Sequence, residues 1–326
     1  MKSWKNYAID MIKEQAEREI YQENRGDTDS DDETISSYNL KRYSKLKREY
    51  SKYYRFKVKN KDNQYLLKLF VQTEFDRETL DFIIETPRWS FITNSLNWAM
   101  SWVYTKTDIM GYIGMGKMFI LSTNQYKRIL RLIYNDNNNE KNLDDLLYLN
   151  TMNNIGSGCG TTTLCMAPLF KFVTATEASK GMVYSLKKKG IDSVFCLDIE
   201  QCEELKDTSY DIISCLNVLD RCEKPISLLN SIKNFLNPNG KIILAVVYPF
   251  RPYVEFGGID NKPLEHIELK QETIEDYVHS FNTNVFKPNG FELDAFTVAP
   301  YISEGDALYQ NYVLTDAVFV LKVKDR

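Results

Sequence analysis

From residue 149 onward, short apolar segments alternate with segments in which apolar residues recur at helical spacing. The apolar, strand-like segments are Leu149–Ile155, Phe172–Glu177, Ser193–Asp198, Tyr210–Leu216, Gly240–Val247, Phe291–Tyr301 and Tyr312–Val323. The helical segments fall at 161–170, 179–189, 224–236 and 272–288. Repeated strand–helix units of this kind predict a parallel sheet that is covered by helices on both faces.

The last two strand-like segments have no helical segment between them, so we expect them to form an antiparallel hairpin. Seven mostly parallel strands with an antiparallel C-terminal hairpin are the layout of class I S-adenosylmethionine (SAM) methyltransferases. A nicotinamide-binding fold would more often continue with parallel units. We therefore predict an α/β protein with the class I SAM-methyltransferase fold and a helical N-terminal extension.

The pattern before residue 149 predicts two further regions. Residues 1–60 form a charged, partly flexible extension, and 61–148 form a helical N-terminal part of the catalytic domain, whose SAM-binding Rossmann-like core is 149–326. Within the extension, 41–59 holds nine Lys or Arg residues with four tyrosines between them. Such a stretch could contact nucleic acid or an acidic partner. We favour a helix face that leads into a strand over Gln64–Phe70.

Composition excludes several classes of protein. The 326 residues carry a net charge of −4, which is too mild for polyanion binding through bulk charge. The six cysteines lie between Cys159 and Cys222 without a CxxC pair, so we expect reduced core thiols and no zinc site of the usual spacing. No signal-peptide pattern or apolar stretch of membrane-spanning length is visible. We therefore expect a cytoplasmic monomer that does not bind nucleic acid.

A glycine-rich segment follows the first strand of the core and opens a helix. It reads Asn154-Ile-Gly156-Ser-Gly158-Cys-Gly160. Glycine permits a sharp turn and lets a ligand approach the backbone amides. The spacing G-x-G-x-G differs from the dinucleotide pattern G-x-G-x-x-G. Its place between a strand and a helix predicts a cofactor-binding loop at Gly156 and Gly158.

Two carboxylates follow the next strands. Glu177 lies 21 residues after Gly156, at a strand end, where it can accept hydrogen bonds from both ribose hydroxyls of a nucleoside. A solvent-facing strand-end glutamate is the alternative, and the neighbouring glycine loop favours the ribose role. Asp198 ends the third strand and could meet the adenine amino group. A strand-end carboxylate without a ligand is the alternative, and we leave these two interpretations open.

Polar residues follow the strand over Tyr210–Leu216. Ligands bind beyond the carboxyl ends of strands in such sheets, so Asn217 and Asp220 are placed where methyl donor and acceptor would meet. A turn asparagine and a helix-capping aspartate are the structural alternative. The segment 248–255, with two prolines and two tyrosines, could wall a substrate pocket or be a rigid apolar loop.

Several longer motifs are specific to one family. They are FVQTEFDRET (Phe70–Thr79), GYIGMGKMFILS, YDIISCLNVLDRC, PFRPYVE, DAFT (Asp294–Thr297), EGD (Glu304–Asp306) and YVLTDAVFVLK. Over about 65–323 the chain closely resembles the protein-histidine methyltransferases of the methyltransferase-like protein 9 (DREV) family.

This resemblance implies SAM-dependent methylation of the pros nitrogen (Nδ1) of histidine in His-x-His motifs of protein substrates. An aspartate that accepts Nε2–H would select the reactive tautomer, as a triad aspartate does from the other ring edge. We assign that role to Asp220, with Asn217 fixing the donor or the ring and Tyr253 and Tyr301 contacting substrate. A SAM methyltransferase of a small molecule or histidine dipeptide, or a binding protein with this fold, is the alternative.

The chain departs from the family at three positions. Asn154 and Cys159 stand where the family has acidic residues, and Arg251 stands where the family has a histidine. The family's first acid supports the loop and the methionine end of SAM. Asparagine lacks the charge to pair with an ammonium group. We therefore expect Asn154 to contact SAM with reduced affinity and Arg251 to alter substrate choice.

Overall fold

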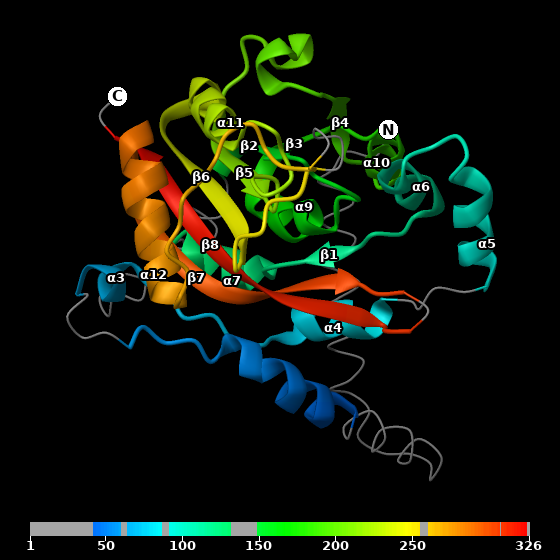
Figure 1. Ribbon diagram of the computed structural model, residues 1–326, viewed down its shortest axis with the longest axis horizontal. Coiled ribbons are helices and arrows are strands. Elements are labelled where there is room, and N and C mark those ends of the chain that lie inside the picture. The colour runs from blue at the N-terminus through cyan, green and yellow to red at the C-terminus, as the bar shows by residue number, and fades with distance from the viewer. Residues whose placement is uncertain are drawn as a thin grey trace.

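A mixed sheet of eight strands forms the centre of the computed structural model (Figure 1). The structure describes residues 42–59, 64–86, 91–131, 149–254, 260–306 and 308–324. Most of the predicted N-terminal extension lies outside these ranges. Within it, a helix covers 42–50, as the favoured interpretation of the basic stretch predicts.

The strand order is β1-β7-β8-β6-β5-β2-β3-β4. Strands β2 to β6 run parallel, and β8 is antiparallel to both β6 and β7, which confirms the class I methyltransferase fold and its C-terminal hairpin. The sheet has one strand more than the seven predicted, because β1 pairs with the edge of β7. The strands are β1 (Met118–Phe119), β2 (Leu149–Ile155), β3 (Phe170–Glu177), β4 (Asp192–Phe195), β5 (Tyr210–Leu216), β6 (Leu236–Tyr248), β7 (Phe291–Glu304) and β8 (Asn311–Val323).

Helices connect the strands and cover the sheet. They are α3 (Gln64–Leu69), α4 (Arg77–Glu85), α5 (Phe91–Met100), α6 (Lys106–Ile113), α7 (Thr123–Ile129), α9 (Thr161–Met166), α10 (Lys180–Lys188), α11 (Pro225–Ile232) and α12 (Ile274–Ser280). Shorter turns are η1 (Ser51–Tyr54), η2 (Ala167–Leu169), η3 (Ile199–Gln201), η4 (Glu203–Leu205), η5 (Lys233–Phe235), η6 (Phe281–Phe286, π-helical) and η7 (Lys287–Asn289). None of the helices in the described ranges combines the length and apolar character needed to cross a membrane.

The strand predicted over Gln64–Phe70 is wrong, because this segment forms helix α3. Leu66 and Phe70 are four residues apart, so a helix turns both toward the same side. Leu66 is fully buried, and the Phe70 ring lies 5.4 Å from the Phe296 ring of β7. Burial of this pair explains why the helix prevails over the apolar run that resembled a strand.

From Asp316 to Leu321, strand β8 is buried on both faces of the sheet. Ala317, Phe319 and Leu321 belong to the core beneath α11, α12 and η6, whereas Val318 and Val320 belong to the core beneath α4, α7 and α9. The side chains of a strand alternate between faces, so a strand covered on both sides is apolar at nearly every position. Asp316 is the exception in this run, and it is fully buried.

The motif FVQTEFDRET is structural in this protein. Asp76 caps α4 by accepting the Thr79 N–H at 3.0 Å, and it also accepts the Ser122 hydroxyl at the start of α7. Glu78 accepts the Thr123 N–H at 2.9 Å. These capping bonds satisfy the free amides at two helix starts and fasten the helices together. They fix the chain just after β1, which lies next to the candidate site.

Candidate active site

The glycine loop between β2 and α9 has no room for side chains. Gly156, Gly158 and Gly160 all have positive φ values, between 54° and 85°. A Cβ on Gly156 would lie 2.5 Å from Val218 Cγ2, and one on Gly158 would lie 2.9 Å from Met118 Cε. Only glycine combines this conformation with so close an approach. The loop therefore exposes backbone where a side chain would otherwise stand.

Glu177 ends β3 beside this loop, as predicted. Its Oε2 accepts the Gly158 N–H at 2.7 Å and its Oε1 accepts the Ser179 N–H at 3.0 Å. Burial raises the pKa of the carboxyl group, and these backbone bonds act in the opposite direction. A carboxylate offers about four lone-pair sites, so the two bonds leave capacity for about two more donors such as ribose hydroxyls.

Asn154 lies inside the protein. Its side chain is 1% exposed. Its Nδ2 donates to the Thr163 hydroxyl at 2.7 Å, and its Oδ1 accepts the Ser214 hydroxyl at 2.9 Å. These bonds tie β2 to α9 and β5. Asn154 thus supports the loop, and its predicted contact with SAM stays a prediction.

Asp198 lies three residues beyond the end of β4, not on the strand as predicted. It is exposed and caps η3, where it accepts the Glu200 N–H at 3.0 Å and the Gln201 side-chain amide at 2.9 Å. A strand-end position was expected because the apolar residues continue to Leu197, but that leucine is 77% exposed. The adenine contact of Asp198 stays a prediction.

Asn217 and Asp220 follow β5 at the carboxyl edge of the sheet. Asn217 has a left-handed φ of 56°, and its N–H donates to the Ala245 carbonyl of β6 at 2.9 Å. Asp220 is 2% exposed, and its Oδ2 lies 3.2 Å from Arg221 Nε. Burial raises the pKa of Asp220, and the Arg221 charge opposes this shift. The structure thus places both predicted catalytic residues at one turn.

A second aspartate, on β8, binds the side chain of Asn217. The sequence motifs did not single it out as a site residue. Asp316 of β8 is fully buried, and its Oδ2 accepts the Asn217 side-chain amide at 2.8 Å. Burial is the main cause that raises its pKa to about 8, and the neighbouring Asp220 charge adds to the shift. A lone acidic residue within an apolar strand was the sequence signal for it.

Three oxygens of this cluster have no hydrogen-bond partner among the described residues. They are Asn217 Oδ1, Asp220 Oδ1 and Asp316 Oδ1, and all are buried. Buried polar atoms are nearly always paired, so unpaired ones at a ligand site indicate where a donor binds. The cluster is rich in acceptors and has one adjacent cation, Arg221, in the described chain around it. It is therefore suited to a hydrogen-bond donor or a cation.

Tyr301 and Tyr253 lie beside the cluster. The Tyr301 hydroxyl donates to Met118 Sδ at 2.7 Å, and its pKa is raised by burial and by the charges of Asp316 and Asp220. The Tyr253 N–H donates to the Asp220 carbonyl at 2.8 Å, while the Tyr253 side chain is half exposed. The loop after β6 therefore contacts the turn that holds Asn217 and Asp220, as the wall of a pocket would.

Gly114 and Gly116 form a second glycine cluster, which lies just before β1 in the motif GYIGMGKMFILS. Glu304, at the end of β7, accepts the N–H groups of Gly116 and Lys117 through Oε2, at 2.7 and 2.9 Å. These bonds hold the segment that enters β1. Met118 is thereby held between the Tyr301 hydroxyl and Gly158 of the glycine loop. Glu304 connects the two glycine clusters, and the sequence alone did not indicate it.

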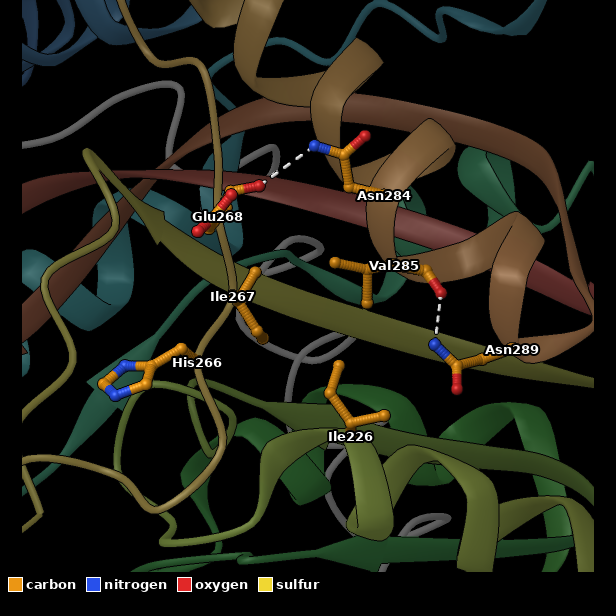
Figure 2. Close-up of a pocket in the computed structure, with 7 residues that line it drawn as sticks. All are labelled: Ile226, His266, Ile267, Glu268, Asn284, Val285 and Asn289. Atoms are coloured by element: carbon orange, nitrogen blue, oxygen red, sulfur yellow. Dashed lines mark hydrogen bonds between the residues drawn. The ribbon is translucent and has the colours of Figure 1, made fainter.

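A separate cavity of about 370 Å³ lies between the start of α11 and η6 (Figure 2). It is lined by Ile226, His266, Ile267, Glu268, Asn284, Val285 and Asn289. The Asn284 and Asn289 amides donate to the Glu268 and Val285 carbonyls, at 3.1 and 2.7 Å. None of the predicted site residues lines it. His266, one of the lining residues, is exposed.

Known methyltransferases are similar in sequence to part of this chain. The mitochondrial ubiquinone biosynthesis O-methyltransferase of Schizosaccharomyces pombe is 30% identical over 99 residues, which are 28% of this chain and 36% of that protein. The Pasteurella multocida enzyme of the same name is 24% identical over 107 residues, covering 28% and 44%. The chain thus spans less than half of either relative.

A solved structure also matches: N-methyltransferase NodS from Bradyrhizobium japonicum WM9, in complex with S-adenosyl-L-homocysteine. It is 12% identical, with 55% of this chain and 80% of that chain covered and a TM-score of 0.35. The model of the DREV methyltransferase family matches residues 56–323, which are most of the chain. The resemblance seen in the motifs is thereby confirmed, and the chain belongs to the DREV methyltransferase family.

Proposed function

We propose that the protein is a SAM-dependent protein-histidine methyltransferase that modifies Nδ1 in His-x-His motifs. The observation that carries this proposal is the pair of unpaired, buried acceptor oxygens on Asn217 and Asp220. A neutral imidazole brings one N–H donor to such a cluster, and its methylation creates a cation. Acceptors fixed where positive charge develops stabilise that charge in the transition state.

The residues around the glycine loop fit the methyl donor. Gly156 and Gly158 have no room for a Cβ, so the loop presents bare backbone, and Glu177 keeps lone pairs for ribose hydroxyls. SAM bound here would supply a methyl group on a positively charged sulfur. Asp198 is our candidate for the adenine amino group, and the acidic cluster beyond β5 favours positive charge on the donor.

Asp220 is placed to choose the reactive tautomer of the substrate. By accepting Nε2–H, its carboxylate leaves the lone pair on Nδ1. As the N–CH3 bond forms and the S–CH3 bond breaks, the positive charge passes to the imidazole ring beside Asp220 and Asn217. The Nε2 proton then leaves to water and restores a neutral methylated ring. Positioning supplies much of the acceleration, because methyl transfer requires nucleophile, carbon and sulfur in line.

The named curated relatives act on oxygen, and this cluster suits oxygen less well. A hydroxyl acceptor must lose its proton and pass through an anionic form. An ionised Asp220 beside the acceptor repels such an anion, whereas a neutral imidazole attacks through Nδ1 without first losing a proton. A nitrogen acceptor on a histidine dipeptide or another small molecule would be as well served as a protein histidine, so it is the second candidate.

Labelled SAM with a His-x-His peptide tests the proposal. We expect transfer to this peptide, none to its His→Ala counterpart, and slow transfer to free histidine dipeptides. Asp220→Asn should lower kcat by about a hundredfold or more, as loss of a tautomer-selecting aspartate does, and leave the Kd for SAM within about threefold. Faster transfer to the dipeptide would favour the small-molecule function. SAM binding without transfer to any nitrogen acceptor would overturn the proposal.

A further inference from the structure

Asp316 is an ionisable residue at one of the most deeply buried positions of the sheet. It pairs in register with Val247 of β6 on one side and Ala299 of β7 on the other. Its side chain is completely buried, and apolar residues follow it along β8. An acidic group in such surroundings persists only when it is paired or protonated. An aspartate at a position where valine or leucine would pack therefore calls for a functional explanation.

Asn217 supplies the hydrogen-bond partner of Asp316. The Asn217 side-chain nitrogen donates to Asp316 Oδ2 at 2.8 Å, while its backbone N–H is held by the Ala245 carbonyl at 2.9 Å. Asn217 is thus fixed at its main chain and at one end of its amide. The other end, Oδ1, is buried and has no partner among the described residues.

The orientation of this amide decides what Asn217 can offer a ligand. An amide has a donor end and an acceptor end, which are similar in shape. A partner that accepts takes the NH2 end and leaves the oxygen for the ligand. Asp316 is such a partner, since it presents a carboxyl oxygen to the Asn217 nitrogen.

We propose that Asp316 is a positioning residue that keeps the Asn217 oxygen, rather than its NH2 group, toward the substrate. The inference rests on the proposed function, because an oxygen at this place stabilises the positive charge that the histidine ring gains during methylation. With the amide reversed, its NH2 group would face the ring and would repel the positive charge formed during methylation.

The groups that face Asp316 come from four other elements. They are Asp220 after β5, Tyr301 of β7, Tyr277 of α12 and Tyr126 of α7. All are acids, and no cation acts on Asp316 within the described chain. A protonated Asp316 still has a carbonyl oxygen that accepts from Asn217. An asparagine at 316 offers the same acceptor in the same shape, which makes it the conservative substitution.

The test compares Asp316→Asn, Asp316→Leu, Asn217→Ala and the double variant Asn217→Ala/Asp316→Leu in steady-state assays with a His-x-His peptide. Asp294→Asn is the matched control, because Asp294 is an aspartate of neighbouring β7 that pairs with Lys241 and Lys322 at the opposite edge of the sheet. We expect Asp316→Leu to lower kcat at least thirtyfold with the Kd for SAM within threefold. Asp316→Asn should restore activity to within fivefold of the wild type at pH 7.

Coupling between the two residues separates positioning from a merely structural role. If Asp316 acts through Asn217, the double variant should match Asn217→Ala within twofold. Losses that multiply in the double variant, or Asp316→Leu with wild-type kcat, would overturn the inference.

A readout without turnover keeps this result distinct from the proposed function. The side-chain amide signal of Asn217, identified by its loss in Asn217→Ala, is followed by nitrogen NMR. We expect a clear shift in Asp316→Leu and a smaller one in Asp316→Asn. If the wild type does not methylate histidine, the proposed function fails while this shift still supports the orientation. An unshifted signal in Asp316→Leu overturns the inference in either case.

Discussion

The N–H of Gly158 donates to the carboxylate of Glu177 across 2.7 Å, so the glycine loop and the end of β3 are joined directly. The same carboxylate accepts the Ser179 N–H at the turn before α10. Glu177 therefore has two functions at once, because it shapes the loop and keeps lone pairs for a ligand. A substitution here should change both the loop and the affinity for SAM.

Glu177→Gln tests this double role. Glutamine keeps one acceptor oxygen but presents an NH2 group where the carboxylate accepts, so one backbone amide and one ribose hydroxyl lose their partner. We expect the Kd for SAM, measured by calorimetry, to rise at least tenfold. Glu203→Gln is the control, since Glu203 is exposed and pairs with the exposed Lys206, and it should leave the Kd unchanged. Equal affinities in both variants would show that Glu177 does not bind the donor.

Gly156→Ala should damage the cradle beyond the cost of its backbone conformation. Gly190 provides the control, because its φ of 76° is similar but a Cβ there would meet no atom within 4 Å. We expect Gly190→Ala to cost about 1 kcal/mol of stability and to leave SAM binding unchanged. Gly156→Ala should cost more, because its Cβ overlaps Val218, and should weaken SAM binding about tenfold. Denaturant unfolding and calorimetry measure both effects, and indistinguishable variants would refute this explanation.

Asn154→Asp restores the charge that the family carries at this position. Both hydroxyl partners, Thr163 and Ser214, can donate to a carboxylate, so the new side chain can keep its hydrogen bonds. Because the site is 1% exposed, burial of the charge should cost about 1–3 kcal/mol of stability. The negative charge should tighten SAM binding several-fold by attracting its ammonium group.

Asn153→Asp is the control for this comparison, because Asn153 is equally buried but points to the opposite face of β2. It should lose stability without a gain in affinity. An unchanged Kd for SAM in Asn154→Asp would mean that the asparagine does not limit donor binding.

The raised pKa of Asp316 predicts how stability depends on pH. In the unfolded chain this carboxyl ionises near pH 4, whereas in the folded protein it holds its proton up to about pH 8. Folding is therefore penalised increasingly as pH rises from 4 to 8, and the penalty is constant above that range. The free energy of unfolding of Asp316→Asn, relative to the wild type, should rise over this range by at most about 1.4 kcal/mol per pH unit.

Asp294 should show the opposite sign. Its two lysine partners lower its pKa, so it contributes stability above the ordinary carboxyl range and loses that contribution on acidification. Asp294→Asn should be less stable than the wild type at pH 7, and the difference should shrink toward pH 3. Denaturant titrations across pH measure both variants. A pH-independent difference for Asp316→Asn would contradict the buried-acid explanation.

Much of the fold was predictable because the strand–helix rhythm after residue 149 is clear. Strands β2 and β5 have the predicted bounds, and the glycine loop lies between β2 and α9 as expected. The two-residue strand β1 was missed because so short a segment has no periodicity. The helix over Gln64–Leu69 was mistaken for a strand because its apolar run is too short to distinguish the two.

The site was predictable to the extent that residues follow strand ends. Asn217, Asp220 and Glu177 lie where the parallel sheet places them. Asp316 and Glu304 were missed because their partners are 99 and 188 residues away in the chain, and such distant pairs leave no local pattern. Asp198 was placed on the strand because the apolar run extends past the last paired residue, Phe195.

The position of the methyl group on the substrate tests the proposed chemistry most directly. A His-x-His peptide methylated by the wild-type protein is hydrolysed to amino acids, and the two methylhistidine isomers are separated and quantified. In the proposed function Asp220 accepts the Nε2–H hydrogen bond, so the product should be almost entirely Nδ1-methylhistidine. Nε2-methylhistidine as the main product would contradict the assigned roles of Asp220 and Asn217.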